Sequence, residues 1–144
     1  MSKRLQGKIA LVTGAGSGIG EATALRFAEE GATVVLCGRR IEPLQGVQEK
    51  IHAQGGQAEI AVADVSDEQA YVGALQATAQ RHGRLDILVN NAMAYTWGGI
   101  DTMSTADWHA NFATTVDGTF WGTRTAMQLM KAQGGGAIVN IASI

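Results

Sequence analysis

Thr13-Gly14-Ala15-Gly16-Ser17-Gly18-Ile19-Gly20 is the stretch that decides the fold of this chain. It joins two segments of different periodicity. The apolar run Lys8–Thr13 before it predicts a β-strand, and the amphipathic segment Gly18–Glu30 after it predicts a helix that stops at Gly31. A turn of this kind leaves bare backbone N–H groups at the start of a helix.

Bare N–H groups at a helix N-terminus bind a pyrophosphate, which side chains would otherwise keep away. The glycine spacing suits this use, because Gly14 allows the tight turn, Gly18 the close approach and Gly20 the packing of helix on strand. Ser17 and Ile19 complete the set of candidate cofactor-binding residues in the turn. The stretch therefore predicts a dinucleotide site, and a purely structural glycine turn is the weaker alternative.

The rest of the chain alternates short apolar runs with longer amphipathic segments. Further strands are predicted at Thr33–Cys37, Gln57–Ala63, Asp86–Asn90 and Ala137–Ile141, and further helices at Ile41–Gln54, Glu68–His82 and Thr105–Ala132. Ser66 and Asp67 offer a cap for the helix that follows them. This alternation predicts an α/β fold with a doubly wound, Rossmann-type parallel sheet, and residues 1–144 are expected to form a single domain.

The long helix Thr105–Ala132 carries two sets of apolar residues. Trp108, Phe112, Ala126 and Leu129 belong to one set, and Val116, Phe120, Met127 and Met130 to the other. A helix that is apolar on more than one side needs more than one packing partner. Core packing is therefore the expected role of its Trp, Phe and Met side chains.

The end of the second strand bears on the choice of cofactor. Dinucleotide folds often place an acidic residue there, about 20 positions after the glycines, to bind the adenosine ribose hydroxyls. In this chain Gly38 takes that place and Arg39 and Arg40 follow it. Guanidinium groups bind a 2′-phosphate, which a carboxylate would repel, so NADP(H) is the expected cofactor and NAD(H) is possible. Solvated surface charge is the alternative interpretation of both arginines.

Composition excludes several function classes. The chain has 144 residues, of which 46% are hydrophobic and 17% charged, and a net charge of −2, so neither disorder nor nucleic-acid binding is expected. No apolar stretch is long enough for a signal peptide or a membrane span, which predicts a cytoplasmic protein without membrane contact. Cys37 lies in an apolar run and is expected to be a buried structural thiol. His52, His82 and His109 lack the spacing of metal ligands.

Three further segments make the pattern specific. Asp64-Val65 follows the third predicted strand, Asn90-Asn91-Ala92 ends the fourth, and Asn140-Ile141-Ala142-Ser143 ends the fifth. With the glycine turn, these segments resemble, in order and spacing, the short-chain dehydrogenase/reductase family. The resemblance implies a strand order of 3-2-1-4-5 and hydride transfer between NAD(P)(H) and a ketone or secondary alcohol.

The resemblance also implies roles for individual residues. Asp64 would meet the adenine amino group, and Val65 would lie beside the adenine ring. Asn91 and Ala92 would support the central sheet and border the adenosine ribose. Ser143 matches the catalytic serine that binds the substrate oxygen, although a hydroxyl bonded to backbone is the alternative.

Two positions depart from the family pattern. Met93 stands where the family has glycine, and Thr115 stands where it has an asparagine that holds a water in the proton relay. A threonine hydroxyl can still bind a water, and Asn111, one turn earlier, could share that role. We therefore expect Met93 and Thr115 to weaken the relay, and expect Thr115→Asn to leave the activity of a complete enzyme unchanged or higher.

The family's Tyr-x-x-x-Lys motif, which follows the serine, does not occur before the last residue, Ile144. Relative to the family, the sheet is expected to stop after the fifth strand, and this chain alone is expected to lack measurable dehydrogenase activity. A non-catalytic dinucleotide-binding sensor or assembly protein is the alternative function, and a methyltransferase is a third. The expected partners are a small carbonyl or alcohol substrate and a second copy of the chain, held through the long helix and the edge of the fifth strand.

Overall fold

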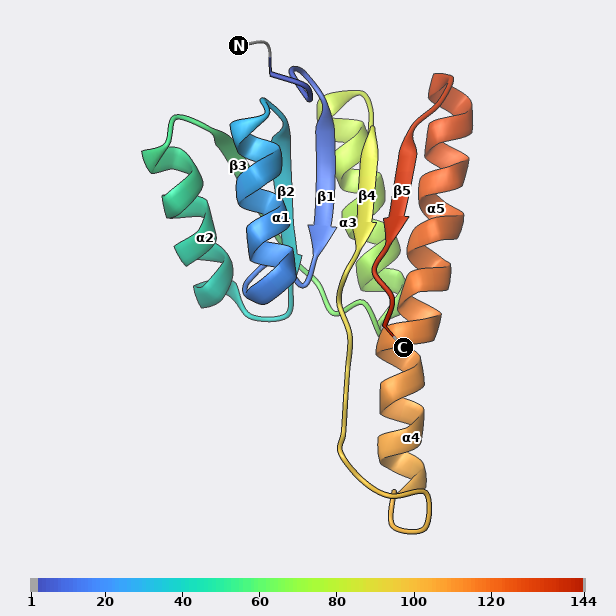
Figure 1. The fold of residues 1–144 in the computed structure, drawn as a ribbon. Coiled ribbons are helices and arrows are strands. Elements are labelled where there is room, and N and C mark those ends of the chain that lie inside the picture. Colours follow the sequence, from blue (N-terminus) through green and yellow to red (C-terminus); the bar gives the residue numbers. More distant parts are fainter. Residues whose placement is uncertain (1–2, 144) are drawn as a thin grey trace.

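The computed structural model describes residues 3–143. Their strands form one sheet, made of β1 (Ile9–Thr13), β2 (Thr33–Gly38), β3 (Gln57–Val62), β4 (Ile87–Asn90) and β5 (Ala137–Asn140). All neighbouring strands are parallel and their order is β3-β2-β1-β4-β5 (Figure 1). The predicted Rossmann-type sheet and its strand order are confirmed.

Helices cover both faces of this sheet. The first face carries α1 (Gly18–Glu29) and α2 (Ile41–Ala53), and the second carries α3 (Glu68–His82) and α5 (Gly118–Gln133) (Figure 1). The chain turns after α1 at Gly31, whose φ of +93° favours glycine, as the sequence predicts. The predicted cap of α3 is also confirmed, because the Asp67 carboxylate accepts a hydrogen bond from the backbone N–H of Ala70.

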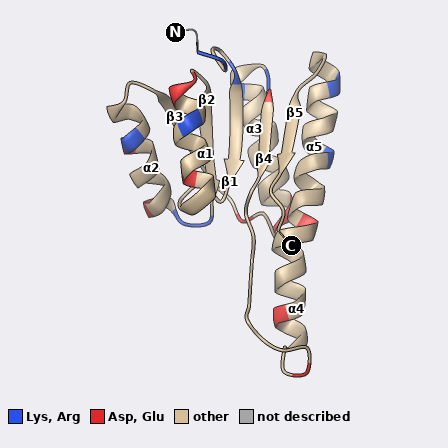
Figure 2. Cartoon of the chain, in the orientation of Figure 1, with Lys and Arg blue, Asp and Glu red and all other residues tan. Residues whose placement is uncertain are grey.

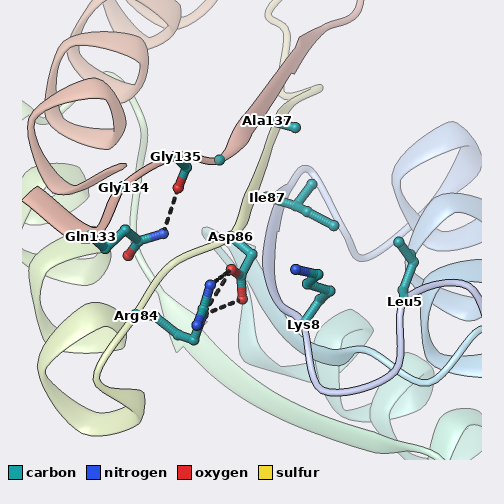
Figure 3. A pocket seen from close by; sticks show the side chains of 10 residues that line it. Leu5, Lys8, Arg84, Asp86, Ile87, Gln133, Gly134, Gly135 and Ala137 are labelled. Atoms are coloured by element: carbon teal, nitrogen blue, oxygen red, sulfur yellow. Dashed lines mark hydrogen bonds and ion pairs between the residues drawn. The ribbon is translucent and has the colours of Figure 1, made fainter. Parts of the chain in front are cut away.

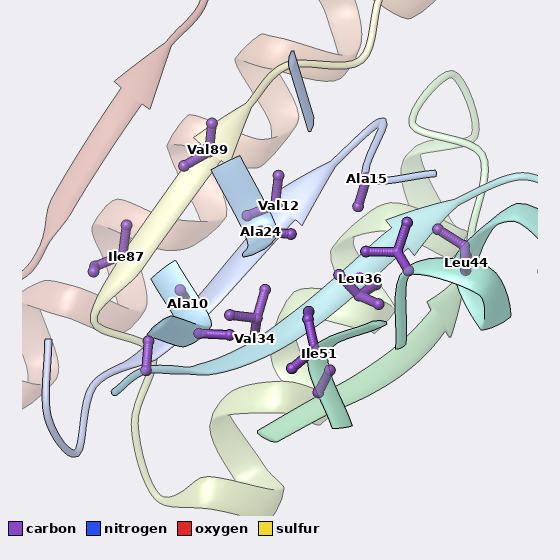
Figure 4. Close-up of a cluster of buried hydrophobic side chains, with 14 residues drawn as sticks. Ala10, Val12, Ala15, Ala24, Val34, Leu36, Leu44, Ile51, Ile87 and Val89 are labelled. Atoms are coloured by element: carbon purple, nitrogen blue, oxygen red, sulfur yellow. The ribbon is translucent and has the colours of Figure 1, made fainter. Parts of the chain in front are cut away.

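Strand residues alternate between two apolar clusters, one on each face of the sheet. Figure 4 shows the first, where Val12, Val34 and Leu36 lie with Ala24 of α1 and Leu44 of α2. The second cluster joins residues of β1, β2 and β4 to α3 and α5, and it includes Cys37. Burial raises the pKa of the Cys37 thiol to about 12, so the side chain is a neutral core group, as predicted.

The predicted long helix is interrupted. It consists of α4 (Thr105–Phe112), a π-helical segment, η1 (Ala113–Asp117), and α5. Such segments add a residue to a turn and shift the faces of the helix that follows. At ~1.5 Å per residue, the helical stretch is about 40 Å long, roughly three times the length of β4 and β5 beside it, which have four residues each.

This length makes one prediction about the core wrong. Ala126 and Met130 of α5 are buried, but Trp108, Phe112, Phe120 and Met127 are 43–57% exposed. For Trp108 and Phe112 the reason is visible in Figure 1, where α4 extends beyond the carboxyl ends of the strands and the sheet no longer covers it. The homo-oligomer predicted from the sequence stays a prediction.

A hydrogen-bonded carboxylate lies at the amino ends of the strands, far from the glycine turn. The Asp86 carboxylate is buried, accepts from the backbone N–H of Ile9 at 2.9 Å, and receives the guanidinium of Arg84 at 2.8 Å (Figure 3). Burial alone would raise the pKa of Asp86, but the hydrogen bonds from Arg84 and Ile9 outweigh it, so this pKa lies below its usual value.

A carboxyl group whose pKa is lowered by folding stabilises the folded state above its unfolded-state pKa of about 3.9 and loses that contribution as the pH falls below it. We expect Asp86→Asn to lower the urea midpoint at pH 7, and the gap from the parent chain to shrink below about pH 4. The measurement is urea unfolding at several pH values. Asp101→Asn, in an exposed loop, is the matched control. A gap that is constant with pH would contradict the proposed role of the ionised carboxylate.

Candidate functional site

A cavity of 550 Å³ opens at the carboxyl ends of the strands. It collects side chains and backbone from the ends of four strands, in segments far apart in the sequence. The sequence-predicted residues that line it are Gly14, Ser17, Gly18, Ile19, Arg39, Asp64, Val65, Asn91 and Ala92. It is also lined by Gly16, Gly38, Arg40, Pro43, Leu44, Ala63, Met93 and Thr114. Open parallel sheets bind ligands at this edge, where neighbouring strands connect in opposite directions.

The glycine turn has the backbone geometry that its spacing predicts. Gly14 and Gly18 have φ values of +61° and +55°, in the region that disfavours side chains. A Cβ at Gly20 would collide with the carbonyl oxygen of Gly14, so helix α1 can approach the turn only without a side chain there. A Cβ at Gly18 would meet nothing within 4 Å, which leaves this side of the turn open toward a ligand.

The end of β4 is fixed to the end of β1. The hydroxyl of Thr13 accepts hydrogen bonds from the backbone N–H groups of Asn91 at 2.9 Å and Ala92 at 3.0 Å. The side-chain amide of Asn91 donates in return to the carbonyl oxygen of Thr13 at 3.1 Å. This exchange holds Asn91 and Ala92 beside the glycine turn, so both support the centre of the sheet and line the cavity.

Positive charge gathers at the β2 end of the cavity. The link from β2 to α2 contains Arg39 and Arg40 and is blue in Figure 2. Both side chains are exposed, and within residues 3–143 neither has a hydrogen bond or an ion pair. Leu44 of α2 lies next to Gly38, 3.1 Å from where a Cβ would be, so apolar side chains also line this end of the cavity. Two cations without partners at a cavity rim can bind an anionic group.

Asp64 and Val65 lie at the neighbouring end of β3. The Asp64 carboxylate accepts from the backbone N–H of Ser66 at 2.9 Å and from its hydroxyl at 2.7 Å. Those bonds orient the carboxylate and leave the side chain only partly buried. Val65 is buried and presses against Gly118, where a Cβ would lie 2.9 Å from the Val65 carbonyl oxygen.

A chain of polar groups leads from the buried Tyr71 of α3, through the buried Asn90, to the exposed Asn140 at the end of β5. The hydroxyl of Tyr71 donates to the Asn90 side-chain oxygen at 2.6 Å, and the amide of Asn90 donates to the side-chain oxygen of Asn140 at 2.9 Å. Burial raises the pKa of Tyr71 above its ordinary value, so the phenol stays a neutral donor. Tyr71 lies on α3 and its partner Asn90 on β4, so no local pattern in the sequence indicates this contact.

The two candidate catalytic residues do not line the cavity. Ser143 is exposed, three residues beyond Asn140 at the end of β5. The hydroxyl of Thr115 donates to the carbonyl oxygen of Ala94 at 3.3 Å and accepts from the N–H of Ala94 at 3.2 Å. Its neighbour Thr114, in the same π-helical segment, lines the cavity instead and was not among the residues predicted from the sequence. A water-holding role for Thr115 stays a prediction.

The histidines and the helices do not form another kind of site in the described part of the chain. Residues 3–143 contain no group of three or more His, Cys, Asp or Glu side chains that could hold a metal ion. His82 instead lies 3.1 Å from Glu59, and His52 lies 3.2 Å from the carbonyl oxygen of Ala58. Over the same part of the chain, no helix has the length and hydrophobicity needed to cross a bilayer.

Comparison with known proteins agrees with this geometry. Residues 8–144 match the family model described as short chain dehydrogenase. The chain is 41% identical over 138 residues to an uncharacterised oxidoreductase of Thermotoga maritima, which covers 96% of this chain but 54% of that protein. The chain thus spans about half the length of the curated relatives that it matches.

Solved structures show the same fold. A metagenomic short-chain oxidoreductase in complex with NADP is 39% identical and superimposes with a TM-score of 0.94, over 97% of this chain and 64% of that one. An NAD⁺-bound xylitol dehydrogenase is 34% identical, with a TM-score of 0.93, over 98% of this chain and 55% of that one. The sheet, the glycine turn and these matches together place the chain in the short-chain dehydrogenase family of NAD(P)-dependent oxidoreductases.

Proposed function

We propose that the chain is the dinucleotide-binding part of an NADP(H)-dependent oxidoreductase, which interconverts a ketone and a secondary alcohol. The observation that carries the cofactor choice is the pair of unpartnered guanidinium groups beside Gly38 at the β2 end of the cavity. A 2′-phosphate on the adenosine ribose would give Arg39 and Arg40 the anionic partner that residues 3–143 do not supply. The NADP complex of the metagenomic relative agrees with this choice, and the NAD⁺ complex of the xylitol dehydrogenase makes it worth testing.

The remaining cavity residues fit the other parts of a dinucleotide. The open backbone at Gly18 and the first turn of α1 would hold the pyrophosphate, with Ser17 and Ile19 at its sides. The oriented carboxylate of Asp64 would accept from the adenine amino group, and Val65 would lie against the adenine ring. Asn91 and Ala92, held by Thr13, would border the ribose.

The chemistry then divides between cofactor and protein. When bound, the cofactor supplies the hydride, and the protein orients it and the substrate. Ser143 would donate a hydrogen bond to the substrate oxygen, where negative charge grows as a ketone is reduced. The Tyr71–Asn90–Asn140 chain would hold the end of β5 and with it the backbone that leads to Ser143.

Equilibrium titration of the chain with NADPH, NADH and S-adenosylmethionine tests the proposal. We expect NADPH to bind about ten- to hundredfold more tightly than NADH, the effect of one charged hydrogen bond worth ~1.5–3 kcal/mol. We expect no binding of S-adenosylmethionine. Equal or tighter binding of NADH would refute the cofactor choice. Cofactor binding without turnover in a full-length protein would favour the non-catalytic sensor.

A further inference from the structure

The segment that follows β4 is attached to the long helix at two points. Ala94 exchanges two backbone hydrogen bonds with the hydroxyl of Thr115, and the hydroxyl of Thr96 donates to the side-chain oxygen of Asn111 at 3.4 Å. Thr115 and Asn111 are one helical turn apart, a rise of about 6 Å, and two residues of extended chain span about the same distance. The segment therefore runs antiparallel to the helix and in register with it.

Met93 lies between two fixed points of the backbone. On one side the N–H of Ala92 donates to Thr13, and on the other Ala94 is bound to Thr115. Met93 is among the residues that line the cavity, and it is 65% exposed. A large apolar side chain held at a cavity rim by fixed backbone is placed to contact whatever fills the cavity.

The order of the strands says which part of a dinucleotide that would be. Arg39 and Asp64 follow β2 and β3, whereas Met93 follows β4, on the far side of β1. Strands in a sheet are about 4.8 Å apart, so Met93 stands about 10 Å along the sheet edge from the arginines. If the 2′-phosphate lies at Arg39 and the pyrophosphate at the glycine turn of β1, Met93 reaches the nicotinamide half.

We propose that Met93 is an affinity-determining contact for the nicotinamide half of the cofactor, and that Thr115 and Asn111 are positioning residues that hold it there. The inference rests on the proposed dinucleotide site. A thioether packs well on the face or edge of a ring, which a glycine at this position could not do. The hydroxyl of Thr115 thus serves the cofactor through the backbone of Ala94.

Two ligands distinguish binding of the nicotinamide half from binding of the adenosine half. NADPH contains the two halves, whereas adenosine 2′,5′-bisphosphate contains only the phosphorylated adenosine half. Each ligand is titrated against the 144-residue chain. We expect Met93→Gly to weaken NADPH about three- to tenfold, the size of one thioether–ring contact, and to leave the bisphosphate unchanged. Met93→Leu, which keeps an apolar side chain of similar volume, should bind NADPH within about twofold of the parent chain.

The positioning role is tested by two substitutions at Thr115. Thr115→Val keeps the branched shape but removes the hydroxyl, and should weaken NADPH by the same factor as Met93→Gly. Thr115→Ser keeps the hydroxyl and should restore the affinity. Unchanged binding of adenosine 2′,5′-bisphosphate shows that each variant retains the folded adenosine site.

The outcomes distinguish failure of the Met93 contact from failure of the proposed dinucleotide site. If the parent chain binds neither ligand, the dinucleotide site itself is refuted, and the role of Met93 with it. If both ligands bind but Met93→Gly binds NADPH as tightly as the parent, or more tightly, the site stands and the contact is overturned. If Thr115→Ser fails to restore what Thr115→Val loses, the positioning role of the hydroxyl is overturned.

Discussion

Gly38→Asp is expected to reverse the cofactor preference proposed above, from NADPH over NADH to NADH over NADPH. A carboxylate at the end of β2 would accept hydrogen bonds from the free ribose hydroxyls of NADH and would repel the 2′-phosphate of NADPH. Losing one charge-assisted contact and gaining another should shift the ratio of the two dissociation constants by about 10²–10³. The measurement is titration of both cofactors against parent and variant.

Two further substitutions separate charge from shape. A Cβ at Gly38 would lie 3.1 Å from Cδ2 of Leu44, so any side chain there requires a small movement of that flexible leucine. Gly38→Ala adds the same Cβ without charge and should keep the preference for NADPH. Arg39→Gln should weaken NADPH about ten- to hundredfold with little effect on NADH. An unchanged preference in both Gly38→Asp and Arg39→Gln would place the 2′-phosphate elsewhere.

Ser143→Ala is expected to lower kcat/KM for carbonyl reduction by about 10²–10³ in a full-length protein, the effect of removing one hydrogen bond to a developing oxyanion. The dissociation constant of NADPH should not change, because Ser143 does not line the dinucleotide cavity. The assay compares initial rates on a panel of ketones with cofactor titration of the same preparations. Ser143→Thr, which keeps a hydroxyl, is the matched control.

A full-length Ser143→Ala variant that turns over ketones at the parent rate would contradict the proposed role of the serine. A variant that loses NADPH affinity together with turnover would instead indicate that Ser143 supports the shape of the site. We expect turnover to fall without a loss of NADPH affinity, because Ser143 lies exposed beyond the end of β5 and is not a member of the Tyr71–Asn90–Asn140 chain.

Local patterns predicted most of this fold, because their physical causes are local. The glycines at 14, 18 and 20 are required by a turn of a few residues, and this glycine pattern predicts a ligand site beside the turn. The cap of α3 at Asp67 needs only the N–H of Ala70, three residues away. The burial of Cys37 follows from an apolar strand in a sheet covered on both faces.

The prediction that the Trp, Phe and Met side chains of the long helix pack in the core was wrong for most of them, because burial depends on contacts that are not local in the sequence. An apolar periodicity shows that a face can be buried, but whether it is buried depends on what lies opposite. Trp108 and Phe112 have that periodicity, yet they are exposed because α4 runs past the end of the sheet. A count of residues along a regular helix also cannot detect the π-helical segment Ala113–Asp117, whose Thr114 lines the cavity.

The sequence by itself therefore determined the parallel sheet, the order of its elements along the chain, the glycine turn and the two arginines beside Gly38. Only the tertiary structure decided which polar groups meet. Asn90 donates a hydrogen bond to Asn140, fifty residues away, and the hydroxyl of Thr115 accepts one from the backbone N–H of Ala94, which lies outside the helix. A hydrogen bond is a short-range contact between groups that the chain path brings together, and no local pattern records that path. For this reason the position of Met93 could be inferred only once β4, η1 and the glycine turn stood around the same cavity.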